Sequence, residues 1–168
     1  MTLTLLAVFQ WFNAWNCRSE EKSLFQMNFL ANKFLVGATL IVVSLQLLVV
    51  YNPLMQKIMH TVALELSDWL IIIPVAASII VVEEVRKFVE EECRKPGANY
   101  GMEAYTHHFI PMVNYAKKLA DKLNADKEIV ELAAWLHDIG SIMIGRDNHH
   151  ITGQDIAEKK LDELGFAK

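Results

Sequence analysis

The sequence contains little cysteine, has no excess of positive charge, and shows no internal repeat or low-complexity tract. Its only cysteines, Cys17 and Cys93, lie far apart and match no metal-binding spacing, so we expect both to be reduced, cytosolic and free of a disulfide. The formal net charge of −4 provides no basic surface for phosphate backbones, which argues against a nucleic-acid partner. Residues 1–15 are apolar, but they lack the basic start and the small-residue cleavage site of a signal peptide.

Hydrophobic residues make up 53% of the chain and are unevenly distributed. Almost all the long apolar runs precede residue 86, whereas the histidines gather between His107 and His150. This asymmetry predicts two modules. We expect an all-α chain in which a partial transmembrane helix and a two-helix hairpin (residues 1–88) precede a charged helix and linker (89–102) and a small soluble helical domain (103–168).

Two apolar runs are predicted to cross a membrane. Phe34–Tyr51 carries no charge and is just long enough to span a bilayer. Trp69–Val82 is shorter, but it can be extended backward over Val62–Leu66, and a membrane helix tolerates Pro74. Residues 1–15 would cover about two-thirds of a ~30 Å hydrocarbon core, as the end of a longer helix would. The alternative, a pair of buried helices in a soluble protein, is disfavoured because no amphipathic segments are present to cover them.

Basic residues predict the orientation of these spans. Arg18, Lys22 and Lys33 precede the first span, and only Lys57 lies in the loop between the two. A further group follows the second span: Arg86, Lys87, Arg94 and Lys95. Because positive residues favour the cytoplasmic side, we expect a multi-pass membrane protein whose loop lies outside and whose C-terminal half lies in the cytoplasm.

Several stretches of the apolar half are distinctive: FQWFNAWNCRSEEKSLF, NKFL, LQLLVVYNPLMQKIM, and the LSDWL run that leads to VVEEVRKF. Across residues 1–88 they resemble the C-terminal end of cation-transporting P-type ATPases. The resemblance implies the last part of the third-from-last transmembrane helix and the final two helices. It also places Gln10 at a cation-coordinating position where the family usually has a carboxylate; a packing or polar contact is the alternative role for this carboxamide.

The phosphorylation motif of that family, Asp-Lys-Thr-Gly, does not occur in these 168 residues. Its nucleotide and actuator domains are missing as well. We therefore expect no ATPase activity from this chain alone.

A charged segment follows the second apolar run. Residues 83–95 (EEVRKFVEEECRK) are predicted to continue the helix out of the membrane, and the PGANYG run at 96–101 then breaks it. This break is the best domain boundary in the chain.

Beyond the break, apolar residues recur at helical spacing in three segments. The stripes are Met112, Val113, Ala116, Leu119, Ala120 and Leu123; Ile129, Leu132, Ala133 and Leu136; and Ile156, Ala157, Leu161 and Leu164, which Gly165 follows as a stop signal. We expect Gly140 to end the second helix and Thr152 to cap the third. Pro111 fits the first helix if that helix begins near His107 or His108, because first-turn amides have no helical partner.

His137 and Asp138 form a candidate metal site at the end of the second helix. An imidazole nitrogen and a carboxylate oxygen together suit a divalent ion such as Zn, Mn, Fe or Mg. Neighbouring residues point ~100° apart around a helix, so both can face one ion only near a helix end, which Gly140 would supply. Such an ion can acidify water and polarise a phosphoryl oxygen. The alternative is a capping aspartate beside a partly buried histidine.

Three stretches of this half follow one another in a characteristic order: HHFIPMVNYAKKLA, ADKEIVELAAWLHDIG and DNHHITGQDIAEKKL. Across residues 103–168 they resemble the HD-domain phosphohydrolase superfamily. The resemblance implies a divalent metal cofactor (Mn, Zn, Fe, Co, Ni or Mg) held by His108, His137 and Asp138. It also implies catalytic roles for Asp138, His149 and His150, the two histidines as second-metal ligands or phosphate contacts.

The sequence departs from the HD pattern in one respect. The family usually adds an aspartate from a later helix, whereas Asp155 and Asp162 come too early and the sequence ends at Lys168. We therefore expect a C-terminally truncated, partial HD domain. His107 has no assigned role, and Arg146 either approaches a substrate phosphate or remains a solvated loop residue.

Two functions of different classes follow. The first is a membrane-attached, metal-dependent phosphohydrolase-like module that acts on a nucleotide or another phosphate ester, with the lipid bilayer and a small phosphorylated substrate as partners. The alternative is a C-terminal fragment of a cation-transporting P-type ATPase with an inert or regulatory histidine-rich tail and the remaining pump domains as partners. A third interpretation is that the two halves are joined without a joint function.

Overall fold

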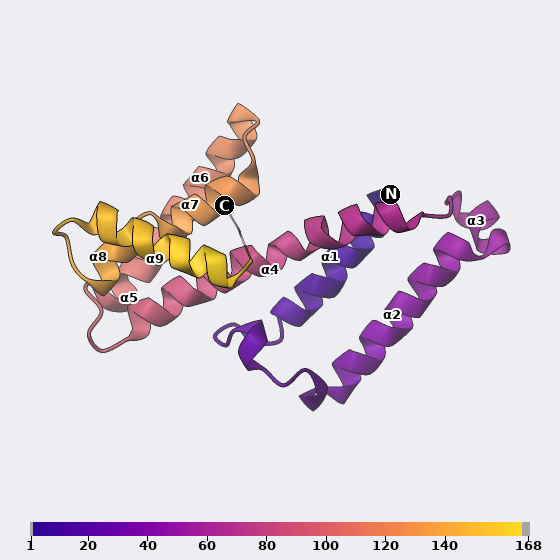
Figure 1. The fold of residues 1–168 in the computed structure, drawn as a ribbon, viewed down its shortest axis with the longest axis horizontal. Helices are drawn as coiled ribbons and strands as arrows, with labels where there is room; N and C mark the ends of the chain where they lie inside the picture. The colour runs from indigo at the N-terminus through magenta and orange to yellow at the C-terminus, as the bar shows by residue number, and fades with distance from the viewer. Residues whose placement is uncertain (1, 166–168) are drawn as a thin grey trace. The chain divides into compact units, whose positions relative to one another are not determined.

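The computed structural model describes residues 2–165, which fold into helices and contain no strand (Figure 1). The predicted all-α class is therefore confirmed. The chain divides after Ile80 into two compact units. The end positions of the predicted domain bounds, 1 and 168, lie outside the described residues.

The first unit contains three helices and the start of a fourth. These are α1 (Thr2–Asn16), α2 (Lys33–Tyr51), α3 (Pro53–Met59) and α4 (Leu66–Arg94), with short 3-10 turns at Leu24–Gln26 and Phe29–Ala31. The second unit contains the end of α4, α5 (Gly101–Ala104), a π-helical turn (Tyr105–Phe109), α6 (Ile110–Leu123), α7 (Lys127–Leu136), α8 (Ile139–Met143) and α9 (His149–Glu163).

Helices α2 and α4 are long and apolar enough to cross a membrane. Only 6% of the apolar window of α2 and 11% of that of α4 is buried inside the protein. The core helix of a soluble protein would be covered by its neighbours, so this low burial favours lipid as the surrounding medium.

Asparagine side chains cap the starts of α2 and α3. The carboxamide of Asn32 accepts from the amide of Leu35 at the start of α2. Asn52 ends α2 and caps α3, with Pro53 in the first turn. The predicted backward extension of the second span over Val62–Leu66 is wrong, because α4 begins at Leu66 and the residues before it form a loop.

Hydrogen bonds stabilise this loop, which explains why α4 does not extend backward over it. The Thr61 hydroxyl donates to the carbonyl of Val49, and the Tyr51 hydroxyl donates to that of Leu64. The Asp68 carboxylate accepts from the amide of Glu65 just ahead of α4. The last two bonds satisfy the carbonyl of Leu64 and the amide of Glu65 outside a helix, so these residues do not need helical pairing.

Polar side chains link the helices of the first unit. Trp15 Nε1 donates to Thr39 Oγ1 over 3.1 Å, and Gln46 Nε2 donates to Thr4 Oγ1 over 3.1 Å, so α1 and α2 are joined at two levels. Hydrogen bonds of this kind connect helices whose apolar surfaces are equally well solvated by lipid. Gln10 is exposed on α1.

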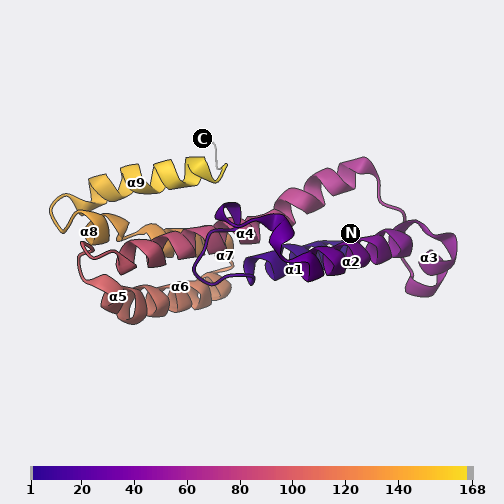
Figure 2. The same ribbon diagram turned by 90° about the horizontal axis from the view of Figure 1, so that it is seen from below.

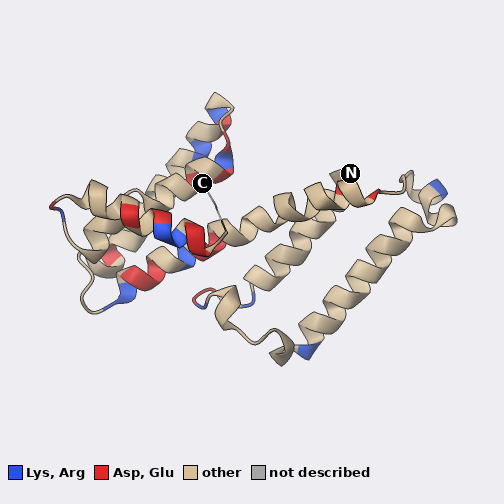
Figure 3. Ribbon diagram, in the orientation of Figure 1, with Lys and Arg blue, Asp and Glu red and all other residues tan. Residues whose placement is uncertain are grey.

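Charged residues are concentrated in the second unit (Figure 3), including the predicted charged continuation of α4. Arg86 forms ion pairs with Glu83 and Glu90 over 2.6 Å. Its guanidinium also donates to the hydroxyl of Tyr105 over 2.9 Å, which connects α4 to the turn that follows α5.

A hydrophobic core holds the helices of the second unit together. It includes Val85 and Val89 of α4, Phe109 ahead of α6, Trp135 of α7 and Ile139 of α8. Figure 2 shows α9 on one side of the end of α4, with α5 and α6 on the other. The predicted inner face of the last helix is confirmed, since Ile156, Ala157 and Leu161 of α9 and the following Leu164 pack against this core.

The helix that carries Pro111 begins earlier than the sequence suggests. It starts at Gly101, continues through the π-helical turn at Tyr105–Phe109 and runs on as α6. The expected start near His107 or His108 is therefore wrong. In the wider turn the amide of Ile110 donates to the carbonyl of Tyr105, five residues back, which makes room for the proline ring that follows.

The predicted roles of Gly140 and Thr152 are also wrong. Helix α7 already ends at Leu136, whereas Gly140 lies inside α8. A Cβ at Gly140 would collide with the carbonyl oxygen of His149 and lie 2.7 Å from the amide nitrogen of Gly153. Gly140 is therefore required for the close approach of α8 and α9. Thr152 lies within α9, which begins at His149.

We predict that Gly140→Ala destabilises the α8–α9 contact by about 3 kcal/mol, because a rigid backbone must move to admit the methyl group. Hydrogen exchange of the full chain in detergent should then be about 100-fold faster at the amides of α8 and α9. Gly97→Ala is the matched control, since a Cβ at Gly97 meets no atom within 4 Å. Equal exchange in the two variants would contradict the close-packing argument.

Candidate metal centre

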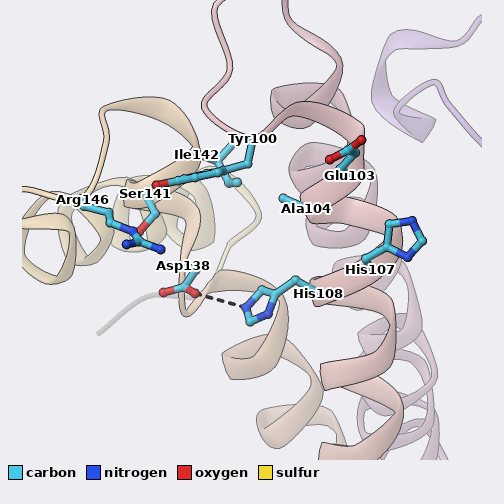
Figure 4. A pocket seen from close by; sticks show the side chains of 9 residues that line it. All are labelled: Tyr100, Glu103, Ala104, His107, His108, Asp138, Ser141, Ile142 and Arg146. Carbon is cyan, nitrogen blue, oxygen red and sulfur yellow. Dashed lines mark hydrogen bonds and ion pairs between the residues drawn. The ribbon is translucent and has the colours of Figure 1, made fainter.

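Three potential ligands converge from two segments that are far apart in the sequence. His108 lies in the π-helical turn ahead of α6, and His137 and Asp138 form the junction between α7 and α8. Figure 4 shows the His108 ring directed at the Asp138 carboxylate. Asp138 has left the helical conformation, with φ −116° and ψ 16°, so its side chain can turn toward the same point as that of His137.

The three ligand atoms form a nearly equilateral triangle. Nε2 of His108 lies 3.1 Å from Nε2 of His137 and 3.2 Å from Oδ2 of Asp138, and the third side is 3.2 Å. An ion about 2.1 Å from each ligand would place the ligand atoms about 3.0 Å apart in octahedral geometry and about 3.4 Å apart in tetrahedral geometry. The observed triangle lies between these values, so the residues fit one face of a divalent-ion site.

Backbone contacts orient His137 for this role. Its Nδ1 lies 2.7 Å from the carbonyl oxygen of Ala134, the distance of an N–H donor bond. A neutral imidazole that donates from Nδ1 leaves a lone pair on Nε2, the atom that faces His108 and Asp138. Metal-binding histidines are commonly fixed in this way by a carbonyl behind the ring.

Aromatic packing brings the two ligand-bearing segments together. The ring of Trp135 on α7 stacks on Tyr105, with centroids 5.8 Å apart, and on Phe109, 6.4 Å away. Phe109 also meets the rings of His108 and His137 edge-on. Since Tyr105 and Phe109 flank the turn that carries His108, this packing sets its distance from His137. Burial raises the pKa of the Tyr105 hydroxyl, which therefore remains a neutral donor or acceptor.

The other predicted residues lie at different distances from the triangle. Nε2 of His149, the first residue of α9, lies 3.9 Å from Oδ1 of Asp138, the carboxylate oxygen that is not part of the triangle. His150 is exposed and packs edge-on against His149. His107 is exposed, and its ring lies apart from the His108–Asp138 pair (Figure 4).

A cavity of about 430 Å³ adjoins the triangle. His108 and Asp138 line it together with Tyr100, Ser141 and Arg146. Arg146 is a residue that the sequence suggests for a phosphate contact, whereas the sequence predicts no role for Tyr100 or Ser141. Only the position of Tyr100 beside Gly101, in the helix-breaking run, indicates an unusual backbone there. No feature of the sequence around Ser141 indicates a functional role.

Comparisons with known proteins give two family matches. The family "Cation transporting ATPase, C-terminus" matches residues 1–89, and the HD domain family matches residues 105–167. The chain therefore belongs to the cation-transporting ATPase C-terminus family, and both predicted resemblances are confirmed as family matches. No solved structure matches the chain.

Individual relatives support the first match. The chain is 37% identical over 101 residues to the mouse calcium-transporting ATPase type 2C member 1, which covers 60% of this chain and 11% of that protein. It is 35% identical over 88 residues to calcium-transporting ATPase 1 of Yarrowia lipolytica, covering 52% of this chain and 10% of that protein. The chain thus spans about a tenth of the length of these relatives.

We predict that the full chain in detergent binds one Mn²⁺, Co²⁺ or Ni²⁺ ion at the triangle. His137→Ala and Asp138→Ala should each lower the affinity by at least about tenfold, because each removes one of three ligands. His107→Ala, which changes a neighbouring histidine outside the triangle, should leave binding unchanged. Calorimetric titration with elemental analysis measures this, and equal metal uptake in all variants would exclude the assigned ligands.

Proposed function

We propose that residues 1–88 form the C-terminal membrane region of a calcium-transporting P-type ATPase. The match of residues 1–89 to the ATPase family supports this proposal, and the names of the relatives suggest calcium as the transported ion. The proposal assigns no catalysis to these residues. They would supply transmembrane helices to a pump whose phosphorylation and nucleotide domains are provided by other residues.

The proposed membrane topology follows from the basic residues. The loop that contains α3 lies outside the cytoplasm, whereas the basic segments and the second unit lie in it. The charged end of α4 fits this orientation, because Arg86 and its acidic partners cannot remain in the hydrocarbon core.

We predict that the chain restores ATP-dependent calcium uptake to vesicles when it is co-expressed with a calcium pump truncated before the matching helices. Val42→Arg should abolish this rescue, because an arginine at the centre of a span costs about 3 kcal/mol of insertion free energy. Val42→Leu is the matched control and should retain uptake.

Rescue by Val42→Arg, or no rescue by a stably inserted wild-type chain, would contradict the pump proposal.

The orientation is tested separately with Lys57→Cys in a Cys17→Ser background. Labelling of this thiol by an impermeant maleimide only from the cytoplasmic side would contradict the proposed topology.

We further propose that residues 103–168 form a metal-dependent phosphohydrolase module of the HD type, joined to the membrane region through residues 89–102. The converging Nε2 atoms of His108 and His137 and the carboxylate of Asp138 support this second function. A divalent ion held there would supply a Lewis acid for a phosphate ester and would acidify water. A nucleotide is the proposed substrate.

Three residues around this ion would have different roles. Asp138 would present Oδ2 to the ion, while His149 approaches Oδ1 of the same carboxylate. His149 would help to orient that carboxylate, because its Nε2 atom lies 3.9 Å from Oδ1. His150, which is exposed and packs edge-on against His149, is the proposed phosphate contact.

We predict phosphatase turnover by the full chain on a panel of nucleotides and simple phosphate esters in the presence of Mn²⁺, Co²⁺ or Ni²⁺. The double variant His137→Ala/Asp138→Ala should be inactive, whereas His149→Ala should be about 10–100-fold slower with metal still bound, because it changes a residue behind a ligand. Gly97→Ala, which changes a residue outside the cavity, should retain the wild-type rate. Turnover that survives the double variant would refute the site.

A further inference from the structure

The wall of the cavity beside the metal centre contains a strained tyrosine. Tyr100 has φ 67° and ψ −13°, in the left-handed region that bulky side chains rarely adopt. The loop before it is fastened to α8, because both the amide and the side-chain nitrogen of Asn99 donate to the carbonyl of Ile142, over 2.9 and 3.2 Å. A glycine would meet this backbone requirement without strain. The strain at Tyr100 and the place of its ring in the cavity wall together point to a role there.

Arg146 occupies the same wall. Its guanidinium carbon lies 5.7 Å from the centre of the Tyr100 ring, so the aromatic face holds the cation at the cavity. Figure 4 shows the guanidinium directed toward the side of the cavity where the Asp138 carboxylate lies. Among residues 2–165 the Arg146 side chain forms no ion pair, so its N–H donors remain available to a ligand.

We propose that Arg146, held by the ring of Tyr100, is an oxyanion subsite for the phosphate group of a phosphomonoester. This inference rests on the proposed metal-dependent function. The planar guanidinium can donate two parallel hydrogen bonds to two phosphate oxygens, while a further oxygen faces the triangle of His108, His137 and Asp138. Ser141 lines the same cavity beside Arg146 (Figure 4), and its hydroxyl can donate to the same group.

The opposite side of the cavity narrows the substrate class. Glu103 lies across the cavity from Arg146 (Figure 4) and presents a carboxylate. A negative charge there repels a second or third phosphate, whereas it can accept a hydrogen bond from an amino or hydroxyl group. A volume of about 430 Å³ suits a compound of the size of a nucleoside monophosphate. The subsite therefore favours compounds with a single phosphate over di- and triphosphates.

Calorimetric titration of the full chain in detergent tests this subsite with inorganic phosphate, adenosine monophosphate and adenosine triphosphate as probes, after the Co²⁺ content has been measured. Arg146→Gln should weaken phosphate and monophosphate binding about 10–100-fold without changing the Co²⁺ content, because it removes a charged donor pair. Tyr100→Gly should weaken binding about two- to fivefold, and Tyr100→Phe, which keeps the ring, should bind as the wild type does. Glu103→Gln should narrow the preference for the monophosphate over the triphosphate.

The outcomes separate this inference from the proposed function. Phosphate binding by cobalt-loaded Arg146→Gln that equals the wild type, or no phosphate binding by the loaded wild type, would overturn the subsite and leave the metal centre standing. If the chain takes up no cobalt, the proposed metal function fails. The same titration on the metal-free chain then decides the subsite, since loss of binding in Arg146→Gln supports it and equal binding overturns it.

Discussion

The metal triangle depends on the packing of Trp135 against Tyr105 and Phe109. These rings lie between the π-helical turn that carries His108 and α7, which ends directly before His137. Their packing sets the separation of the two imidazoles. The π-helical turn contributes to the same end, because its extra residue per turn rotates the side chains that precede Pro111 relative to those that follow. Pro111, the π-helical turn and the aromatic stack therefore act together on the position of His108. The proline and the widened turn would each be costly alone, whereas the aromatic stack is stabilising. Together they present one nitrogen atom of His108 at hydrogen-bond distance from two other ligands.

A second constraint acts on the other side of the triangle. Adjacent residues in a helix cannot direct their side chains at one point, and the chain solves this by ending α7 at Leu136 and starting α8 after Asp138. Gly140 then allows α9 to approach α8 closely. The same approach brings His149 to the oxygen of Asp138 that lies outside the triangle. One glycine therefore helps to place the residue behind a proposed metal ligand.

Much of the helical content could be predicted from the sequence, because apolar runs and helical spacing are local signals. The helix at Lys33–Tyr51, the charged continuation of α4 and the inner face of α9 all follow from such patterns. The errors came from features that depend on distant partners. Gly140 has the local pattern of a helix terminator, but its close neighbours lie across the α8–α9 contact. The loop before Leu66 is held by hydrogen bonds from elsewhere in its unit. Tyr100 was missed for the same reason, since backbone strain and a place in a cavity wall leave no trace in periodicity.

The polar groups of the two units are satisfied in different ways. In the first unit, Thr4, Thr39, Gln46 and Trp15 pair with one another between apolar helices, as side chains must where no water is available. In the second unit, Arg86 and its acidic partners form a network that is only partly buried, and the polar atoms of the triangle and cavity are open to solvent and ligands. Helix α4 belongs to both units, and its sequence changes from apolar to charged within one turn after Val82. All ligands of the proposed metal centre lie beyond that change, so neither the ion nor the substrate requires a residue from the membrane half. The helices that match the ATPase family and the histidine–aspartate site therefore use different residues of the chain.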